Sequence, residues 1–114
     1  MLTSSRRFHG YSSLNYAYRQ GESVRDPKMS LKFALNNRRH NYRVAVVVSR
    51  KVSRSAVVRN RIRRRVYEAI RTNPSPIKDS YDLIFSVHSA ELAAMPSSEL
   101  QNLTLGLLKR AKAV

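Results

Sequence analysis

The arginine-rich segment RSAVVRNRIRRR, residues 54 to 65, places the strongest constraint on how this chain can fold. Six of these twelve residues are arginine, yet apolar side chains recur at the interval of one helical turn. In a helix from Ser55 to Arg71, the apolar stripe would consist of Val58, Ile62, Val66, Ala69 and Ile70. Such a stripe must be buried against another element, and we expect that element to be a sheet.

The opposite side of this predicted helix is mostly basic. Its outer arc would hold Asn60, Arg63, Arg64, Tyr67, Glu68 and Arg71, while Arg61 and Arg65 flank the stripe. Between residues 50 and 71 there are nine basic residues and a single acid, although like charges one turn apart repel each other. Guanidinium groups bind phosphate through two parallel hydrogen bonds and also stack on bases. The arc therefore indicates contact with nucleic acid rather than an ordinary solvated face.

The loop before the helix, residues 49–55, strengthens this interpretation. It adds Arg50, Lys51 and Arg54, and its backbone amides and hydroxyl groups lie near the positive end of the helix dipole. Phosphate groups bind well at such a helix N-terminus. Within the helix, the Asn60 side chain offers a donor and an acceptor to a base edge or a 2′-hydroxyl.

The overall charge agrees with an anionic partner. The 114 residues include 22 Lys and Arg against 7 Asp and Glu, a net charge of +15, and such an imbalance repels itself unless an anion lies against it. No apolar run approaches the ~20 residues that span a bilayer, and the start MLTSSRRFHG lacks the apolar stretch of a secretory signal. Cysteine is absent, which excludes disulfides and Cys-based zinc sites. We expect a soluble cytoplasmic protein that binds nucleic acid.

Local patterns predict seven elements in one domain across residues 1–114. They are a helix over 12–20, strands over 22–24, 28–35 and 43–49, the basic helix over 55–71, a strand over 81–88 and a helix over 98–111. The order αβββαβα predicts an α/β (α+β) two-layer sandwich with a sheet of about four strands. Because the strands over 43–49 and 81–88 flank a helix, we expect them to be parallel neighbours.

The patterns also predict details of these elements. Alternation along KMSLKFAL, residues 28–35, leaves one face of the strand open. The buried face would hold Met29, Leu31, Phe33 and Leu35. The polar loop 36–41 favours a hairpin between this strand and the next, and RVAVVVS over 43–49 is typical of a central strand. Ser98 and Gln101 predict a capping box at the start of the last helix.

No set of residues in the sequence is arranged for catalysis or for binding a metal. His9, His40 and His88 are scattered, and a satisfied hydrogen bond is the expected role of His88 at a strand end. Asp79 and Asp82 lie near a strand start and are interpreted as turn residues. Paired carboxylates, a Gly-rich phosphate loop and a Ser/His/Asp set are all missing, so the chain would assist chemistry performed by another molecule.

At the end of the third strand and the start of the basic helix, the sequence resembles a known family. The runs VSRKV at residues 48–52 and AVVRNRIRR at residues 56–64 are similar to the signature of the bacterial ribonuclease P protein subunit. That signature is a Val-Ser-Lys-Lys-like strand end followed by Arg-Asn-Arg, a hydrophobe and a basic pair. The loop residues 53–56 differ from relatives that carry Gly-Asn-Ala there, and Leu14 and Tyr18 stand where the family often has Phe.

This resemblance implies a fold and a function. The fold would be like the second domain of ribosomal protein S5, with a left-handed βαβ crossover against the usual right-handed rule. The chain would be the protein subunit of an endoribonuclease, paired with a large catalytic RNA that removes the 5′ leader from precursor tRNA. The RNA would carry the chemistry and most of the magnesium, so the chain alone would have no catalytic residue, bound metal or small-molecule cofactor.

The resemblance also assigns residues to two contacts. The RNA subunit would be bound by Arg50, Lys51, Arg54, Arg59, Asn60, Arg61, Arg63, Arg64 and Arg71. A cleft for the single-stranded leader would be lined by Leu14, Tyr18, Ser30 and Lys32. Cations suit the leader backbone and an aromatic ring suits its bases, although Tyr18 equally fits the core of a short amphipathic helix.

Three alternative functions compete with this one. A ribosomal or other structural RNA-binding protein has a similar size, charge and fold, and a preference for precursor over mature tRNA separates the two. A protein-only nuclease requires acidic metal ligands, and cleavage by the chain alone would reveal it. A membrane-surface protein requires an exposed apolar stripe with basic flanks, which the sequence lacks. A basic leucine zipper is excluded, because Pro74 and Pro76 follow the helix where a heptad repeat is needed.

Overall fold

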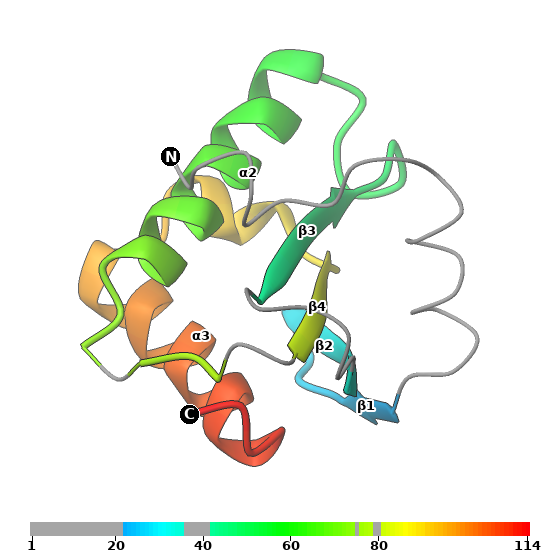
Figure 1. Ribbon diagram of the computed structural model, residues 1–114. Helices are drawn as coiled ribbons and strands as arrows, with labels where there is room; N and C mark the ends of the chain where they lie inside the picture. The colour runs from blue at the N-terminus through cyan, green and yellow to red at the C-terminus, as the bar shows by residue number, and fades with distance from the viewer. Residues whose placement is uncertain (1–21, 36–41, 75, 79–80) are drawn as a thin grey trace.

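The structure, a computed structural model, describes residues 22–35, 42–74, 76–78 and 81–114. In this part of the chain a single sheet has two α-helices and a short 3-10 helix packed on one face (Figure 1). The elements are β1 (Glu22–Val24), β2 (Met29–Leu35), β3 (Arg43–Val48), α2 (Ala56–Arg71), β4 (Tyr81–Val87), η2 (Ala90–Ala93) and α3 (Ser97–Arg110). The two-layer α+β sandwich predicted from the sequence is confirmed.

Six of the seven predicted elements are confirmed, and no boundary is displaced by more than one residue. The helix predicted over residues 12–20 lies outside the described residues, so the single domain over residues 1–114 stays a prediction. The 3-10 helix η2 was not predicted. It begins where Ser89 Oγ accepts a hydrogen bond from the backbone N–H of Glu91 at 3.2 Å, which is a local side-chain cap.

The strand order is β1-β2-β4-β3, and β4 is the central strand that pairs with both β2 and β3. The parallel pairing of β3 with β4 is confirmed. The hairpin predicted across residues 36–41 is wrong, because β2 pairs antiparallel with β4 and not with β3. The central position predicted for residues 43–49 is also wrong, since β3 is an outer strand of the described sheet, whereas β2 and β4 are its interior strands. Accordingly, every residue of β4 except Ser86 is buried.

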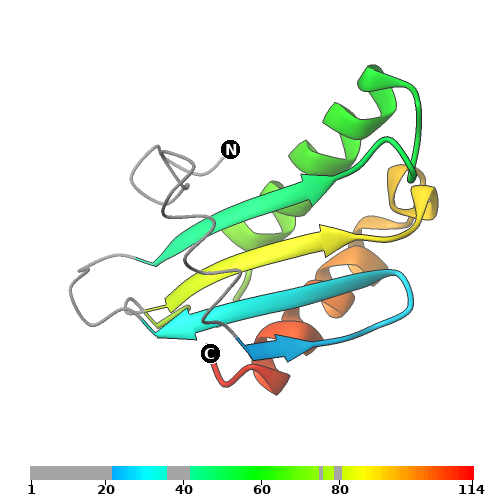
Figure 2. The same cartoon turned by 90° about the vertical axis from the view of Figure 1, so that its right-hand side faces the viewer.

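The connection from β3 through α2 to β4 is a left-handed crossover. In Figure 2 β3 and β4 run in the same direction, α2 lies behind the sheet, and β4 follows below β3. The chain runs forward along β3, returns behind the sheet through α2 and then enters β4 below β3. This path has the sense of a left-handed screw. This is the hand that the family resemblance implied, against the hand of nearly all βαβ units.

The core lies between the sheet and the two α-helices. The largest fully buried side chains are Phe85, Met29, Leu31, Ile62, Ile70, Leu83, Ile84, Leu92, Leu100, Leu107, Leu108 and Val44. The stripe predicted for α2 is confirmed, with Val58 partly buried at its first turn. Tyr67 was expected on the outer arc, but it packs partly buried against the core. Leu35 was expected on the buried face of β2, but it is 63% exposed, because it is the last residue of the strand and lines an open hollow.

Helix α3 begins differently from the sequence prediction and ends in a regular motif. The capping box of Ser98 and Gln101 is wrong, because Pro96 occupies the N-cap position and makes no side-chain cap. Gln101 instead donates a hydrogen bond to the carbonyl oxygen of Thr72 at 3.0 Å, which ties α3 to the end of α2. At the other end Lys112 adopts a positive φ of 60°, and Ala113 N donates to Leu108 O at 3.0 Å, as in a Schellman motif.

Arg43 and Asp82 form a buried ion pair at one end of β3 and β4. The two residues lie directly opposite each other in the parallel register. Arg43 Nε donates to Asp82 Oδ1 at 2.9 Å, and Arg43 Nη2 donates to Oδ2 at 2.8 Å. The interpretation of Asp82 as a turn residue is therefore wrong: it is a strand residue whose carboxylate receives both arms of a guanidinium.

Within the described ranges, no helix has the length and apolar character needed to cross a membrane. The same residues contain no group of three or more His, Cys, Asp or Glu side chains gathered closely enough to hold a metal ion.

Candidate RNA interface

The loop between β3 and α2 is held in shape by its own hydroxyl and carbonyl groups. Ser55 is the N-cap of α2, and its Oγ accepts a hydrogen bond from Val58 N at 3.3 Å. Ser53 Oγ accepts from Ser55 N at 3.2 Å, and the carbonyl oxygen of Ser53 accepts from Arg59 Nη1 at 2.9 Å. The loop that carries three predicted RNA contacts is therefore fixed to the first turn of the helix.

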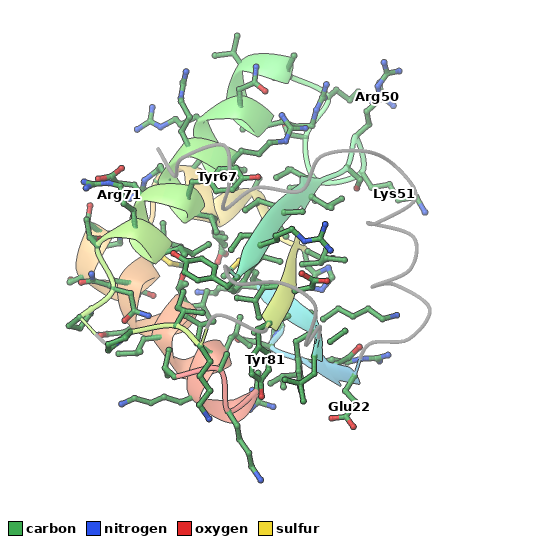
Figure 3. All side chains as sticks on the ribbon, in the orientation of Figure 1. Glu22, Arg50, Lys51, Tyr67, Arg71 and Tyr81 are labelled. Atoms are coloured by element: carbon green, nitrogen blue, oxygen red, sulfur yellow. The ribbon has the colours of Figure 1, made fainter. Side chains whose placement is uncertain are left out.

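Five basic side chains around this loop and helix extend into solvent. They are Arg50, Lys51, Arg54, Arg61 and Arg64, and each of these residues is exposed. None of the five makes a hydrogen bond or ion pair with any other described residue. Figure 3 shows Arg50 and Lys51 pointing outward at the end of β3 where α2 begins. An open hollow between the loop and the helix is lined by Arg50, Lys51, Val52, Ser53, Arg54, Ala56 and Arg59. The four cations in this lining give the hollow a positive charge that suits a phosphate backbone.

Three other helix arginines are bound to oxygen atoms of the protein. Arg59 donates to the Ser53 carbonyl, as described above, and Arg63 donates to Asn60 Oδ1. Arg65 donates through Nη1 to Leu92 O and through Nη2 to Met95 O. Because Arg65 joins α2 to η2 and the turn after it, its guanidinium supports the fold. The sequence prediction had left Arg65 out of the RNA contacts.

Arg71 differs from the rest of the predicted set because it pairs with the single acid of the helix. Its Nε donates to Glu68 Oε1 at 3.1 Å, and its Nη2 also contacts that carboxylate. The hydrogen bond from Arg71 holds the pKa of Glu68 below its ordinary value, and the same bond raises the pKa of Arg71. Both side chains are about half exposed, so the pair is screened by solvent. The RNA contact assigned to Arg71 stays a prediction.

A second polar surface lies on the face of the sheet opposite α2 and α3. Ser30 and Lys32, both predicted leader contacts, are two residues apart on this face of β2. Ser30 Oγ and His88 Nε2 lie 2.7 Å apart, which confirms a satisfied hydrogen bond for His88. The hollow around them is lined by Ser23, Arg25, Ser30, Leu31, Lys32, Ser86 and His88. The other two predicted leader contacts, Leu14 and Tyr18, lie outside the described residues.

Sequence reasoning missed Arg25, Ser86 and His88 as members of this second surface. Ser86 and His88 alternate with buried residues at the end of β4, and Ser86 pairs in register with Ser30. The alternation was visible in the sequence, but the neighbour of β4 was not, because the predicted hairpin joined β2 to the wrong strand. A correct pairing of β2 with β4 would have placed both residues beside Ser30.

Comparison with known proteins gives one consistent result. The chain matches the ribonuclease P family model over residues 2–112. It is 40% identical over 89 residues to the ribonuclease P protein component of Roseiflexus castenholzii, which covers 78% of this chain and 72% of that protein. It is 38% identical over 95 residues to the ribonuclease P protein component of Clostridium novyi, which covers 82% of each.

The fold agrees with these matches. The RNase P protein of Staphylococcus aureus superposes with a TM-score of 0.81 and 26% identity, over 95% of this chain and 96% of that one. The chain therefore belongs to the ribonuclease P protein family, as its strand end and basic helix predicted, and it acts with an RNA partner in tRNA processing.

Proposed function

We propose that this chain binds the catalytic RNA subunit of ribonuclease P through the loop 49–55 and the outer arc of α2. The supporting observation is the set of five exposed cations, Arg50, Lys51, Arg54, Arg61 and Arg64, which lack a partner among the described residues. The backbone beneath these cations is fixed, because α2 packs on the sheet through its apolar stripe and the loop is bonded to the first turn of α2. Because the backbone that carries the cations is ordered before binding, association with a folded RNA costs less conformational entropy than it would for an unfolded basic segment.

The second part of the proposal concerns the substrate. The hollow around Ser30, Lys32 and His88 would hold the single-stranded 5′ leader of precursor tRNA. Hydroxyl, imidazole and ammonium groups suit a sugar-phosphate backbone. These groups are carried by the same sheet whose strand β3 leads into the loop that would contact the RNA subunit. By holding both RNAs, the chain would raise the affinity of the ribozyme for precursor over mature tRNA.

In this proposal the RNA subunit performs the hydrolysis and holds most of the magnesium, in the cytoplasm. The chain contributes positive charge that offsets repulsion between two polyanions, so less magnesium is needed for them to associate. A structural RNA-binding protein of the ribosome, the main alternative, is not favoured by the family matches.

The test is reconstitution. The purified chain is mixed with a bacterial ribonuclease P RNA at a magnesium concentration where the RNA alone is inactive, and release of the 5′ leader is measured. The expected result is cleavage at the mature 5′ end, with tighter binding of precursor than of mature tRNA. Equal affinity for the two tRNAs would contradict the leader contact, and failure to bind the RNA at all would contradict the whole proposal. Cleavage by the chain alone would indicate a protein nuclease.

A further inference from the structure

A separate hollow lies at the opposite end of the sheet from the basic loop. It forms where β2 ends and β4 begins, beside the last turn of α3, whereas β3 ends at the basic loop. Its described lining consists of Glu22, Phe33, Ala34, Leu35, Tyr81, Arg110, Ala111 and Lys112. Figure 3 shows Glu22 and Tyr81 at this end, far from Arg50. The hollow measures about 450 Å³, which lies within the range of pockets that take small ligands.

The floor of this hollow is apolar and partly aromatic. The rings of Phe33 and Tyr81 lie 6.1 Å apart between centroids with 34° between their planes. Phe33 remains partly exposed, and Leu35 is 63% exposed, which only Val57 exceeds among the large apolar side chains of the described residues. An apolar floor of this kind matches the flat face of an unstacked base.

The rim of the hollow carries charge of both signs. Arg110 and Lys112 provide two cations, and Arg110 is anchored because its Nη1 donates to the carbonyl oxygen of Arg25 at 3.0 Å. Glu22 provides one carboxylate, which repels phosphate but accepts hydrogen bonds from the amino group of a base. Two cations, one acceptor and an apolar floor together match a single nucleotide better than a phosphate alone.

The backbone at Lys112 is unusual in a way that bears on this site. Its φ of 60° lies in the left-handed region, which is unfavourable for a residue with a side chain and where glycine is the common residue. The chain places lysine at this helix end although glycine would close the same motif with less strain. Such an exception points to a use for the ammonium group.

We infer that this hollow binds one nucleotide of the single-stranded leader, upstream of the nucleotides that lie on Ser30 and Lys32. This inference rests on the proposed function. Lys32 and Ala34 share one face of β2, whereas Phe33 and Leu35 share the opposite face with Tyr81, so a leader that lies along Ser30 and Lys32 would reach the hollow by turning around the end of β2. The base would lie against Leu35 and Phe33, and its phosphate would contact Lys112.

The experiment uses the assembled ribonucleoprotein and precursor tRNAs whose leaders are lengthened one nucleotide at a time. For the unaltered protein, affinity should rise in steps, with one step when the leader reaches the hollow. Lys112→Gly keeps the backbone motif and removes the ammonium group, so it should lose that last step alone. Its slope of log affinity against log salt should fall by about 0.7 for long leaders only, as expected for one lost single-strand phosphate contact.

Two further variants separate the possible results. Lys109→Ala removes the same charge from the last turn of α3 but outside the hollow, and it should bind long leaders as the unaltered protein does. Leu35→Ser removes exposed apolar surface, and it should lose on the order of fivefold in affinity for long leaders while short leaders bind normally. A melting temperature at or above that of the unaltered protein would show that Lys112→Gly is folded.

Several outcomes would overturn the inference. Equal losses of affinity for long leaders in Lys112→Gly and Lys109→Ala would show that the effect comes from the overall positive charge and not from the hollow. Weaker binding of the ribozyme RNA itself by Lys112→Gly would assign the hollow to the RNA subunit. Normal binding of every leader by both hollow variants would leave the hollow without a role, while the proposed function would stand as long as the unaltered protein still prefers precursor tRNA.

Discussion

Helices α2 and α3 pack on the same face of the same sheet, yet their outer surfaces are opposite in character. Both bury an apolar stripe, with Ile62, Val66 and Ile70 in α2 and with Leu100, Leu107 and Leu108 in α3. The outer surface of α2 is dominated by arginine, whereas α3 has no basic residue before Lys109 in its last turn. Because α3 packs without such charge, packing on this sheet does not require it. The exposed arginines of α2 without a described partner, Arg61 and Arg64, are therefore explained by a partner and not by the fold.

The largest expected effect is on stability, and it comes from altering the feature that both helices share, the buried apolar stripe. Ile62→Asp places a carboxylate at a fully buried position, so we expect more than about 4 kcal/mol of destabilisation and an unfolded domain. Ile62→Val is the control and should cost only about 1 kcal/mol. Circular dichroism during urea unfolding measures both. A folded Ile62→Asp protein would show that the stripe does not anchor α2.

The next largest effect concerns the part that differs, the charge of α2. Arg61→Ala combined with Arg64→Ala removes two exposed cations without a described partner, and it should lower the slope of log affinity for the RNA subunit against log salt by about two units, one for each lost phosphate contact. Affinity at low salt should fall on the order of tenfold or more. Lys109→Ala on α3 is the matched control and should leave the slope nearly unchanged. The measurement is a binding titration at several salt concentrations, and an unchanged slope in the double variant would contradict the interface.

A smaller effect separates two arginines that are neighbours in sequence. Arg65 is bonded to the carbonyl oxygens of Leu92 and Met95, and Arg64 is exposed without a described partner. Arg65→Ala should therefore destabilise the fold by about 2 kcal/mol while the salt slope of RNA binding stays unchanged. Arg64→Ala should do the reverse, with stability within about 0.5 kcal/mol and a slope lower by about one. Urea unfolding measures the stability of both variants, and RNA-binding titrations at several salt concentrations measure their slopes. A lower slope for Arg65→Ala or a large loss of stability for Arg64→Ala would contradict the assignment.

The smallest effect concerns the single acid of α2. The hydrogen bond from Arg71 lowers the pKa of Glu68 below its ordinary value of 4.5. The pair therefore contributes stability that is present above pH 4.5 and is lost as the pH falls through the lower folded pKa. Glu68→Gln should remove this small pH-dependent difference and should also strengthen RNA binding slightly, because Arg71 loses its counter-charge. Unfolding curves between pH 3 and pH 7 compare the two proteins, and parallel curves would show that the pair does not contribute.

The sequence predicted the local features of this fold well because their causes are local. The stripe of α2 follows from the spacing of Ile62, Val66 and Ile70, and the end of the helix follows from Pro74. The basic loop and the arginine arc were likewise visible, because charge and residue type are read directly from the chain. The predicted RNA contacts are consequently the part of the site that needed the structure least.

The failures concern contacts between distant residues. The partner of Asp82 is Arg43, 39 residues earlier, and no local pattern distinguishes such a pair from a turn residue. His88 meets Ser30 across 58 residues, and it does so only because β4 inserts between β2 and β3. A single pairing error, the assumed hairpin, therefore hid the second surface. The hollow near Lys112 was equally hidden, because it joins the ends of β2, β4 and α3.

The central position of β4 has a consequence for how the protein is made. Translation produces β2, β3 and α2 before residue 81, and in the finished sheet β2 and β3 join only through the strand that follows. A nascent chain that ends before Tyr81 therefore contains the highly charged amphipathic helix α2 but not the complete sheet on which α2 packs. The sheet can be completed only in the final third of synthesis, and pairings between strands so distant in the sequence make folding slow.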